Sequence, residues 1–105
     1  MNIFTEMLDF TVDERVNYAK ESSTYEVLAE LANDDEPMVR GAVAKNEYGI
    51  TTDILAKLAK DECWLVRLNV VYNLKTTPSI LNQLSFDSNY AVREAVKLRR
   101  ETGLF

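Results

Sequence analysis

The sequence predicts an all-α protein, an α-solenoid in which three to four short helix pairs stack in a row. Apolar residues recur at helical spacing, and no stretch shows the sustained alternation that is typical of a strand. A pattern of 26 to 27 residues recurs along the chain. Residues 61–74 are apolar on almost every side, so this segment needs protein neighbours on both flanks, and it is too short to span a bilayer.

The repeat is clearest when residues 24–46 are aligned with residues 51–73. At an offset of 27 most apolar positions coincide, and a further offset of 26 finds a third copy. The N-terminal residues keep the spacing, but the second half of that copy is more polar. A terminal repeat has one neighbour and needs a polar outer side. We expect a single domain, 1–105, made of a degraded N-terminal capping repeat 1–21, repeats 24–49 and 50–76, and a C-terminal repeat with its tail, 77–105.

Each repeat has one break in its apolar spacing, which predicts two short helices joined by a turn. Pro37 and Pro78 suit the first turn of a helix, and Gly103 should end the last one. Asn46 and Asn73 stand where the chain leaves a helix, and we expect left-handed turns there because asparagine tolerates them. The expected N-caps of the first helices are Thr24, Thr51 or Thr52, and Thr77. The expected helices are 2–9, 12–21, 24–33, 37–46, 51–60, 63–74, 78–85 and 89–101.

An aspartate stands six residues before an arginine in every repeat. The eight residues are Asp9, Arg15, Asp34, Arg40, Asp61, Arg67, Asp87 and Arg93. An aspartate at a turn can accept backbone N–H bonds, and a planar guanidinium suits bridging, so we expect a structural ladder within or between repeats. Stacked arginines that bind phosphates or carboxylates of a ligand are the alternative.

This recurrence resembles the HEAT-repeat family, in which such a pair forms a ladder along the stack. The fuller pattern VLAELANDDEPMVRGAVAKN looks like the leucine-rich repeat variant (LRV) family of bacteria, and the resemblance covers residues 24–99. It implies a right-handed superhelix whose second helices line a concave side, and a bacterial or phage origin. The type member of the variant family carries an iron–sulfur cluster on a separate cysteine-rich segment, whereas Cys63 is the only cysteine here. One helix of each unit can be a 3₁₀ helix in that family, but 26 or 27 residues leave room for two α-helices.

Charge is unevenly distributed along the chain, whose net charge is −5. Residues 1–53 hold 12 acids and 4 bases, a sum of −8, and residues 54–105 hold 5 acids and 8 bases, a sum of +3. This asymmetry could orient a partner or join copies head to tail, or it could reflect solvated helix faces only. The sequence lacks an apolar run of about 20 residues and a secretory signal, so we expect no membrane contact and a cytoplasmic location.

Enzyme chemistry finds little support in these residues. The chain has no histidine, so the commonest general base and metal ligand is missing, and nothing is suited to activate Cys63. Residues 34–36 are three acids without the ordered spacing of a calcium loop. We therefore expect no catalytic residue, no cofactor and no metal.

The second helices carry the candidate binding residues. Leu65, Leu68 and Tyr72 form an apolar stripe at i, i+3 and i+7, beside the stripe that should face the core. Exposed, it would be a partner groove; alternatively, the superhelix closes over it, or long side chains such as Lys45 and Lys97 cover it. Trp64 and Tyr90 either add an aromatic patch or pack against each other across the repeat interface. The candidate partner surface comprises Lys45, Trp64, Leu65, Leu68, Tyr72, Tyr90, Glu94 and Leu98.

The sequence therefore favours a non-enzymatic protein–protein interaction module with a protein partner. One alternative is a nucleic-acid-binding HEAT-like protein, which the acidic composition disfavours. It would need Lys45, Arg67, Lys75, Arg93, Lys97, Arg99 and Arg100 on one surface. The other alternative is a structural homo-oligomer that joins the acidic N-terminal half to the basic C-terminal half.

Overall fold

The computed structural model describes residue 7 and residues 9–103 of the chain. All regular structure in these residues is helical, and they contain no strand, which confirms the all-α prediction. Each expected helix from residue 12 onward is present, with ends that differ by at most two residues, whereas the expected helix 2–9 lies mainly outside the described residues. The helices are α2 (Val12–Glu21), α3 (Tyr25–Leu31), α4 (Pro37–Ala44), α5 (Thr52–Leu58), α6 (Trp64–Tyr72), α7 (Pro78–Leu84) and α8 (Tyr90–Thr102).

The helix ends follow local chemistry. Thr11 and Glu14 form a reciprocal capping box at α2, which satisfies two N–H groups that no helical carbonyl can reach. Asn89 caps α8, because its side-chain oxygen accepts from the N–H groups of Ala91 at 2.8 Å and Val92 at 3.3 Å. Of the expected threonine caps, all three occupy N-cap positions, but only Thr77 makes a side-chain bond to its helix. Gly103 ends α8 with φ of 64°.

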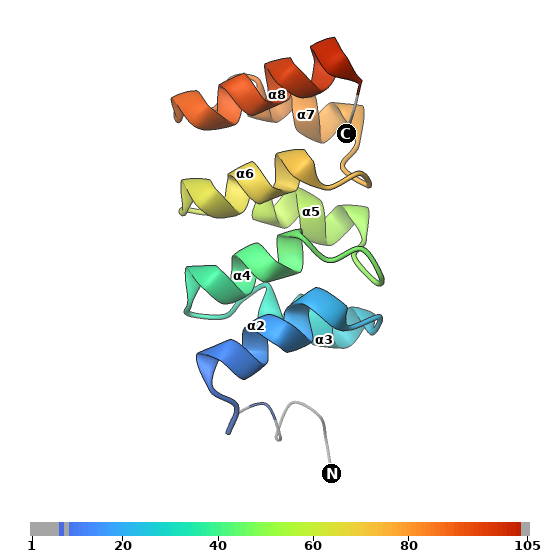
Figure 1. The fold of residues 1–105 in the computed structure, drawn as a ribbon, viewed down its shortest axis with the longest axis vertical. Helices are drawn as coiled ribbons and strands as arrows, with labels where there is room; N and C mark the ends of the chain where they lie inside the picture. Colours follow the sequence, from blue (N-terminus) through green and yellow to red (C-terminus); the bar gives the residue numbers. More distant parts are fainter. Residues whose placement is uncertain (1–6, 8, 104–105) are drawn as a thin grey trace.

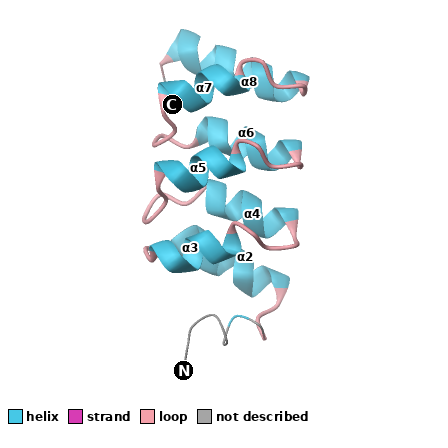
Figure 2. Cartoon of the chain, turned by 180° about the vertical axis from the view of Figure 1, so that it is seen from behind, coloured by secondary structure: helices cyan, strands magenta, loops and turns pink. Residues whose placement is uncertain are grey.

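The helices form two rows. Helices α2, α4, α6 and α8 lie one on the next in the first row (Figure 1), and α3, α5 and α7 form the second row, seen in front when the molecule is turned around (Figure 2). Each second-row helix packs against the two first-row helices that precede and follow it in the sequence. The described chain is elongated along the rows, with extents of 47 × 22 × 18 Å.

The core lies between the two rows. Equivalent positions of successive repeats fill it, because Leu28, Leu55 and Leu81 are buried from the second row and Val39, Val66 and Val92 from the first. A helix of seven to ten residues is marginal alone. Each fully buried Leu or Val stabilises the fold by roughly 1.5–3 kcal/mol relative to an exposed one. Packing between repeats therefore supplies the stability that single helices lack.

The expected left-handed turns at Asn46 and Asn73 are wrong. Gly103 is the only described residue in the left-handed region, and Asn73 has φ of −75° and ψ of 125°. Asn46 is instead fully buried, and its side-chain amide connects two repeats. Its Nδ2 donates to carbonyl oxygens at the end of α2, and its Oδ1 accepts from N–H groups of its own loop. The carbonyls are those of Ala19, Lys20 and Ser22, and the N–H groups are those of Tyr48, Gly49 and Ile50.

The same device recurs in the next two repeats. Asn73 donates to the carbonyl oxygens of Ala44 at 2.8 Å and Asn46 at 3.0 Å. Arg99 stands at the equivalent position in the last repeat, and its Nη1 donates to the carbonyl oxygens of Val71 and Asn73 at 2.6 and 2.8 Å. A helix C-terminus leaves four carbonyls without a helical partner, so each repeat satisfies carbonyls at the end of the preceding one.

A ladder of ion pairs runs in the opposite direction. Arg40 donates from Nε to Oδ2 of Asp61 at 2.8 Å and from Nη2 to Oδ1 at 3.1 Å. Its Nη1 donates back to the carbonyl oxygen of Asp34, in its own repeat, at 2.7 Å. The carboxylate of Asp61 also accepts from the N–H of Cys63 at 2.9 Å. The same two-bond pairing occurs in Arg15–Asp34 and in Arg67–Asp87.

The ladder thus connects each arginine to the aspartate of the following repeat. Six of the eight expected residues take part. Asp9 and Arg93, the two ends of the series, are exposed and belong to no ion pair within the described part of the chain.

Candidate protein-binding surface

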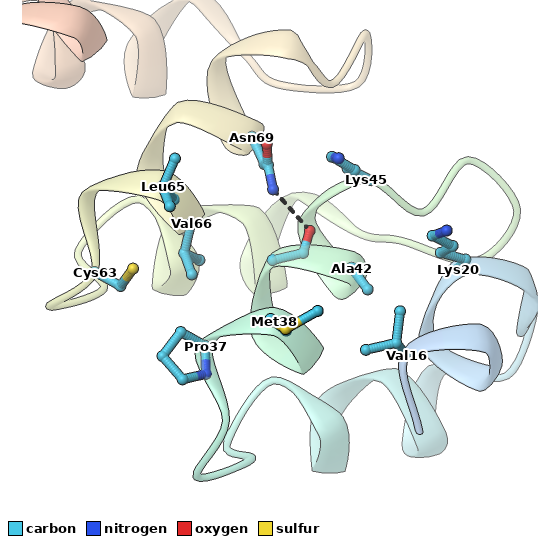
Figure 3. Close-up of a pocket in the computed structure, with 11 residues that line it drawn as sticks. Val16, Lys20, Pro37, Met38, Ala42, Lys45, Cys63, Leu65, Val66 and Asn69 are labelled. Atoms are coloured by element: carbon cyan, nitrogen blue, oxygen red, sulfur yellow. Dashed lines mark hydrogen bonds between the residues drawn. The ribbon is translucent and has the colours of Figure 1, made fainter. Parts of the chain in front are cut away.

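A hollow opens on the first row, between α2, α4 and α6, with a volume of about 380 Å³. Side chains of all three helices line it (Figure 3). They include Val16 and Lys20 from α2, Met38 and Ala42 from α4, and Leu65 and Asn69 from α6. Three consecutive repeats therefore contribute to a single site.

Gly41 lines the hollow at a point where α4 and α6 lie close together. A Cβ atom at this position would lie 3.0 Å from Nδ2 of Asn69 and 3.9 Å from Cγ2 of Val66. Nδ2 of Asn69 also donates to the carbonyl oxygen of Gly41 at 3.2 Å (Figure 3). A side chain at Gly41 would crowd this amide, so the absence of one allows α4 and α6 to approach closely.

The rim of the hollow has an apolar part and a basic part. Met38 and Leu65 are 64% and 52% exposed, which is high for large apolar side chains beside a concavity. Lys20 and Lys45 are exposed at the other side of the hollow, away from Leu65 and Cys63 (Figure 3). A ligand could therefore make apolar contact at one side and meet positive charge at the other.

A second hollow of about 770 Å³ continues along α6. Lys45 and Asn69 line both hollows, so the two are neighbours. Tyr72 and Leu74 add exposed apolar surface, at 47% and 69% exposure, and Lys75 adds a further positive charge. The two hollows together form what we call the α6 groove.

The structure divides the expected apolar stripe. Leu65 and Tyr72 border the α6 groove, whereas Leu68 is half-buried and packs against the core. Leu68 is therefore removed from the candidate surface. The physical reason is that the Leu68 side chain lies on the side of α6 that packs on the core, whereas Leu65 and Tyr72 lie on the side that borders the groove.

The remaining candidate residues lie outside the α6 groove. Trp64, Tyr90 and Leu98 are exposed, and Glu94 is half-buried. Trp64 and Tyr90 do not stack, since the one ring pair in contact among the described residues is Phe10 with Tyr18. The guanidinium of Arg93 instead lies 5.8 Å from the centre of the Tyr90 ring.

Met38, Val16 and Lys20 were not identified from the sequence. Met38 stands at an offset of 27 from Leu65, so the repeat alignment contained a signal for it. Val16 and Lys20 belong to the degraded first repeat, where alignment is weakest. Only the packing of α2 on α4 brings these two residues to the hollow.

The groups with shifted pKa values lie away from the α6 groove. Hydrogen bonding to Asp53 raises the pKa of Tyr25, and hydrogen bonds from Thr51 and Tyr25 lower the pKa of Asp53. Both residues belong to the second-row helices α3 and α5. What the groove offers is apolar contact, lysine charge, the carboxylate of Glu47 and the amides of Asn69 and Asn73, which are the means of binding a protein surface.

The described residues contain no group of three or more acidic or cysteine side chains that could hold a metal ion. None of their helices has the length and apolar character needed to cross a bilayer.

Comparison with protein-family models, with curated proteins and with solved structures gave no match. Function is therefore inferred from the residues and geometry of the chain itself.

Proposed function

We propose that the protein is a HEAT-like α-solenoid, a right-handed superhelix, that acts as a non-enzymatic protein–protein interaction module. The two rows of helices and the repeated Arg–Asp pairs support the HEAT-like assignment. In such an arrangement the first-row helices line the concave side, where the α6 groove lies. A cytoplasmic location is part of this proposal, because the single cysteine suits a reducing compartment.

The observation that carries the proposal is the hollow beside Gly41 with exposed Met38 and Leu65 at its rim. Isolated exposed apolar side chains are normal on a protein surface. A set of them around a concavity is typical of binding sites. The lysines at the other side favour a partner helix with apolar residues on one face and an acidic residue beside them.

The nucleic-acid alternative has less support than protein binding. Of the seven basic residues that it requires, Arg67 is paired with Asp87, and Arg99 donates to carbonyl oxygens of the preceding repeat. Their charges are therefore engaged within the fold and leave fewer free cations for phosphates.

A crosslinking experiment tests the proposed partner surface. A photoreactive amino acid at Leu65 should capture a partner from a lysate of the source cells, and the same group at Phe86 serves as the matched control. Phe86 is 80% exposed but lies in the turn between α7 and α8, outside the α6 groove. We expect a band from position 65 that excess unlabelled protein competes away and that excess Leu65→Glu does not.

The same bands from both positions would contradict the proposal. A band that contains only a second copy of this chain would replace it with the homo-oligomer alternative. Leu65→Glu is expected to fold, because exposed substitutions usually change stability by less than about 0.5 kcal/mol, and circular dichroism checks this.

A further inference from the structure

Arg93 is the fourth arginine of the ladder, and of the bonds that the other three make it keeps only the one from Nη1 to a backbone carbonyl oxygen of its own repeat. Its Nη1 donates to the carbonyl oxygen of Asp87 at 2.7 Å, as Nη1 of Arg67 does to Asp61 at 2.6 Å. In Arg15, Arg40 and Arg67, the Nε and Nη2 groups bind a carboxylate of the next repeat. No described carboxylate takes that place at Arg93, whose side chain is exposed.

The guanidinium of Arg93 is nevertheless held in place. The bond to Asp87 anchors one side of it, and the Tyr90 ring lies 5.8 Å away. Asp87 is itself fixed by Arg67 at 2.8 Å and by the N–H of Asn89 at 2.9 Å. A positioned guanidinium loses less conformational entropy on binding than a mobile one.

The residues beside Arg93 differ from their equivalents in the interior. Lys97 stands where earlier repeats have Ala44 and Val71, both 0% exposed beneath the following repeat. Lys97 and Arg100 share with Arg93 a shallow hollow of about 440 Å³ on α8. Stacking another repeat there would bury the charge of Lys97, which is costly. The outer face of α8 is therefore suited to an anionic ligand.

We propose that this outer face of α8 binds an acidic protein segment, with one aspartate or glutamate carboxylate on the Nε and Nη2 groups of Arg93. The three interior pairs show that this edge of the arginine binds a carboxylate in this fold. Lys97 and Arg100 supply charge for neighbouring acids. Glu94 and Glu101 line the same hollow and repel any anion, so they disfavour the dense, continuous charge of a nucleic-acid backbone more than a segment that places one carboxylate on Arg93. The site is separate from the α6 groove and independent of it.

An NMR titration tests this site. The arginine Nε–H signals of the full chain are followed while a tetra-aspartate peptide is added, with a tetra-asparagine peptide as the neutral control. We expect the Arg93 signal to shift saturably with the acidic peptide only, while the Arg40 signal stays. Arg93→Gln should weaken binding about tenfold, since it removes a charge-assisted two-bond contact, and Arg93→Lys should lie between.

Three results would overturn the proposal. Equal binding by wild type and Arg93→Gln would show that Arg93 does not hold the peptide. Tighter binding of a single-stranded oligonucleotide of equal charge would assign the face to nucleic acid. A shift of the Arg93 signal that follows protein concentration without peptide would identify a second copy as the source of the carboxylate. Thermal melting of Arg93→Gln confirms folding, because this exposed side chain bonds only its own turn among the described residues.

Discussion

Arg40 and Arg93 occupy equivalent positions in their repeats, but their surroundings differ. The Arg40 side chain is 9% exposed and binds Asp61 of the next repeat, whereas Arg93 is exposed and has no such carboxylate among the described residues. Both keep the bond from Nη1 to the turn of their own repeat. A single repeat therefore positions the guanidinium, and the neighbouring repeat decides whether it becomes a buried ion pair.

The contacts of Asn46 also depend on a neighbouring repeat, but on the preceding one. Arg40 reaches forward to the next repeat, while Asn46 reaches back to the end of α2. The amide of Asn46 is fully buried and is a hydrogen-bond partner of six backbone groups. Buried polar groups without partners cost more than surface ion pairs contribute, so the asparagine contacts should matter most for stability.

Removing the Asn46 amide should give the largest effect. Asn46→Ala leaves buried carbonyl and N–H groups unpaired, and we expect a loss of about 3–5 kcal/mol in the free energy of unfolding. Urea unfolding followed by circular dichroism measures it. Asn82→Ala, at an exposed position of α7, is the matched control. A loss below about 1 kcal/mol for Asn46→Ala would mean that water replaces the amide.

Removing the guanidinium should cost more stability in an interior repeat, at Arg40, than in the last repeat, at Arg93. Arg40→Met leaves Asp61 buried without its counterion and should cost about 2–4 kcal/mol. Arg93→Met should change stability by less than about 0.5 kcal/mol, because its side chain is exposed. The same urea experiment on both variants gives the comparison. Equal losses would refute the distinction between the paired Arg40 and the unpaired Arg93.

An effect smaller than the loss expected for Arg40→Met is a pH dependence at Asp87. Burial alone would raise the pKa of Asp87, but hydrogen bonds from Arg67 and from the N–H of Asn89, with the charge of Arg67, lower it from its usual value of 3.8. A carboxyl with a depressed folded pKa stabilises the fold above its unfolded pKa. This stabilisation is lost as the pH falls through the folded pKa.

Asp87→Asn should therefore cost about 1–2 kcal/mol at pH 7 and flatten the acid side of the stability curve. Unfolding in urea between pH 2 and pH 7, compared with Asp35→Asn at an exposed position, measures the change of slope. An unchanged acid slope in Asp87→Asn would show that other carboxyls dominate the loss.

Much of the fold could be predicted because the repeat aligns chemically equivalent residues. The spacing of Val27, Leu28 and Leu31 predicted a helix with these residues on its buried face, and all three are buried in the structure. The error at Asn46 had a physical origin. Asparagine is common in left-handed turns and also bonds backbone groups with its side chain, and a linear pattern does not distinguish these uses.

The candidate site was less predictable than the fold. Leu65 and Leu68 are both apolar and three residues apart, yet one borders a hollow and the other packs on the core. Their difference depends on how α6 packs between its neighbouring helices. The sequence did not indicate that the missing side chain of Gly41 lets α4 and α6 lie close together.

The sequence by itself determined the helical class, the places where helices begin and end, and which positions recur, because these depend on residues close together in the chain. Only the tertiary structure decided that arginines pair forward and asparagines bond backward, and which side of α6 is exposed. Those outcomes depend on contacts between residues 19 to 29 positions apart, which form once the repeats are stacked.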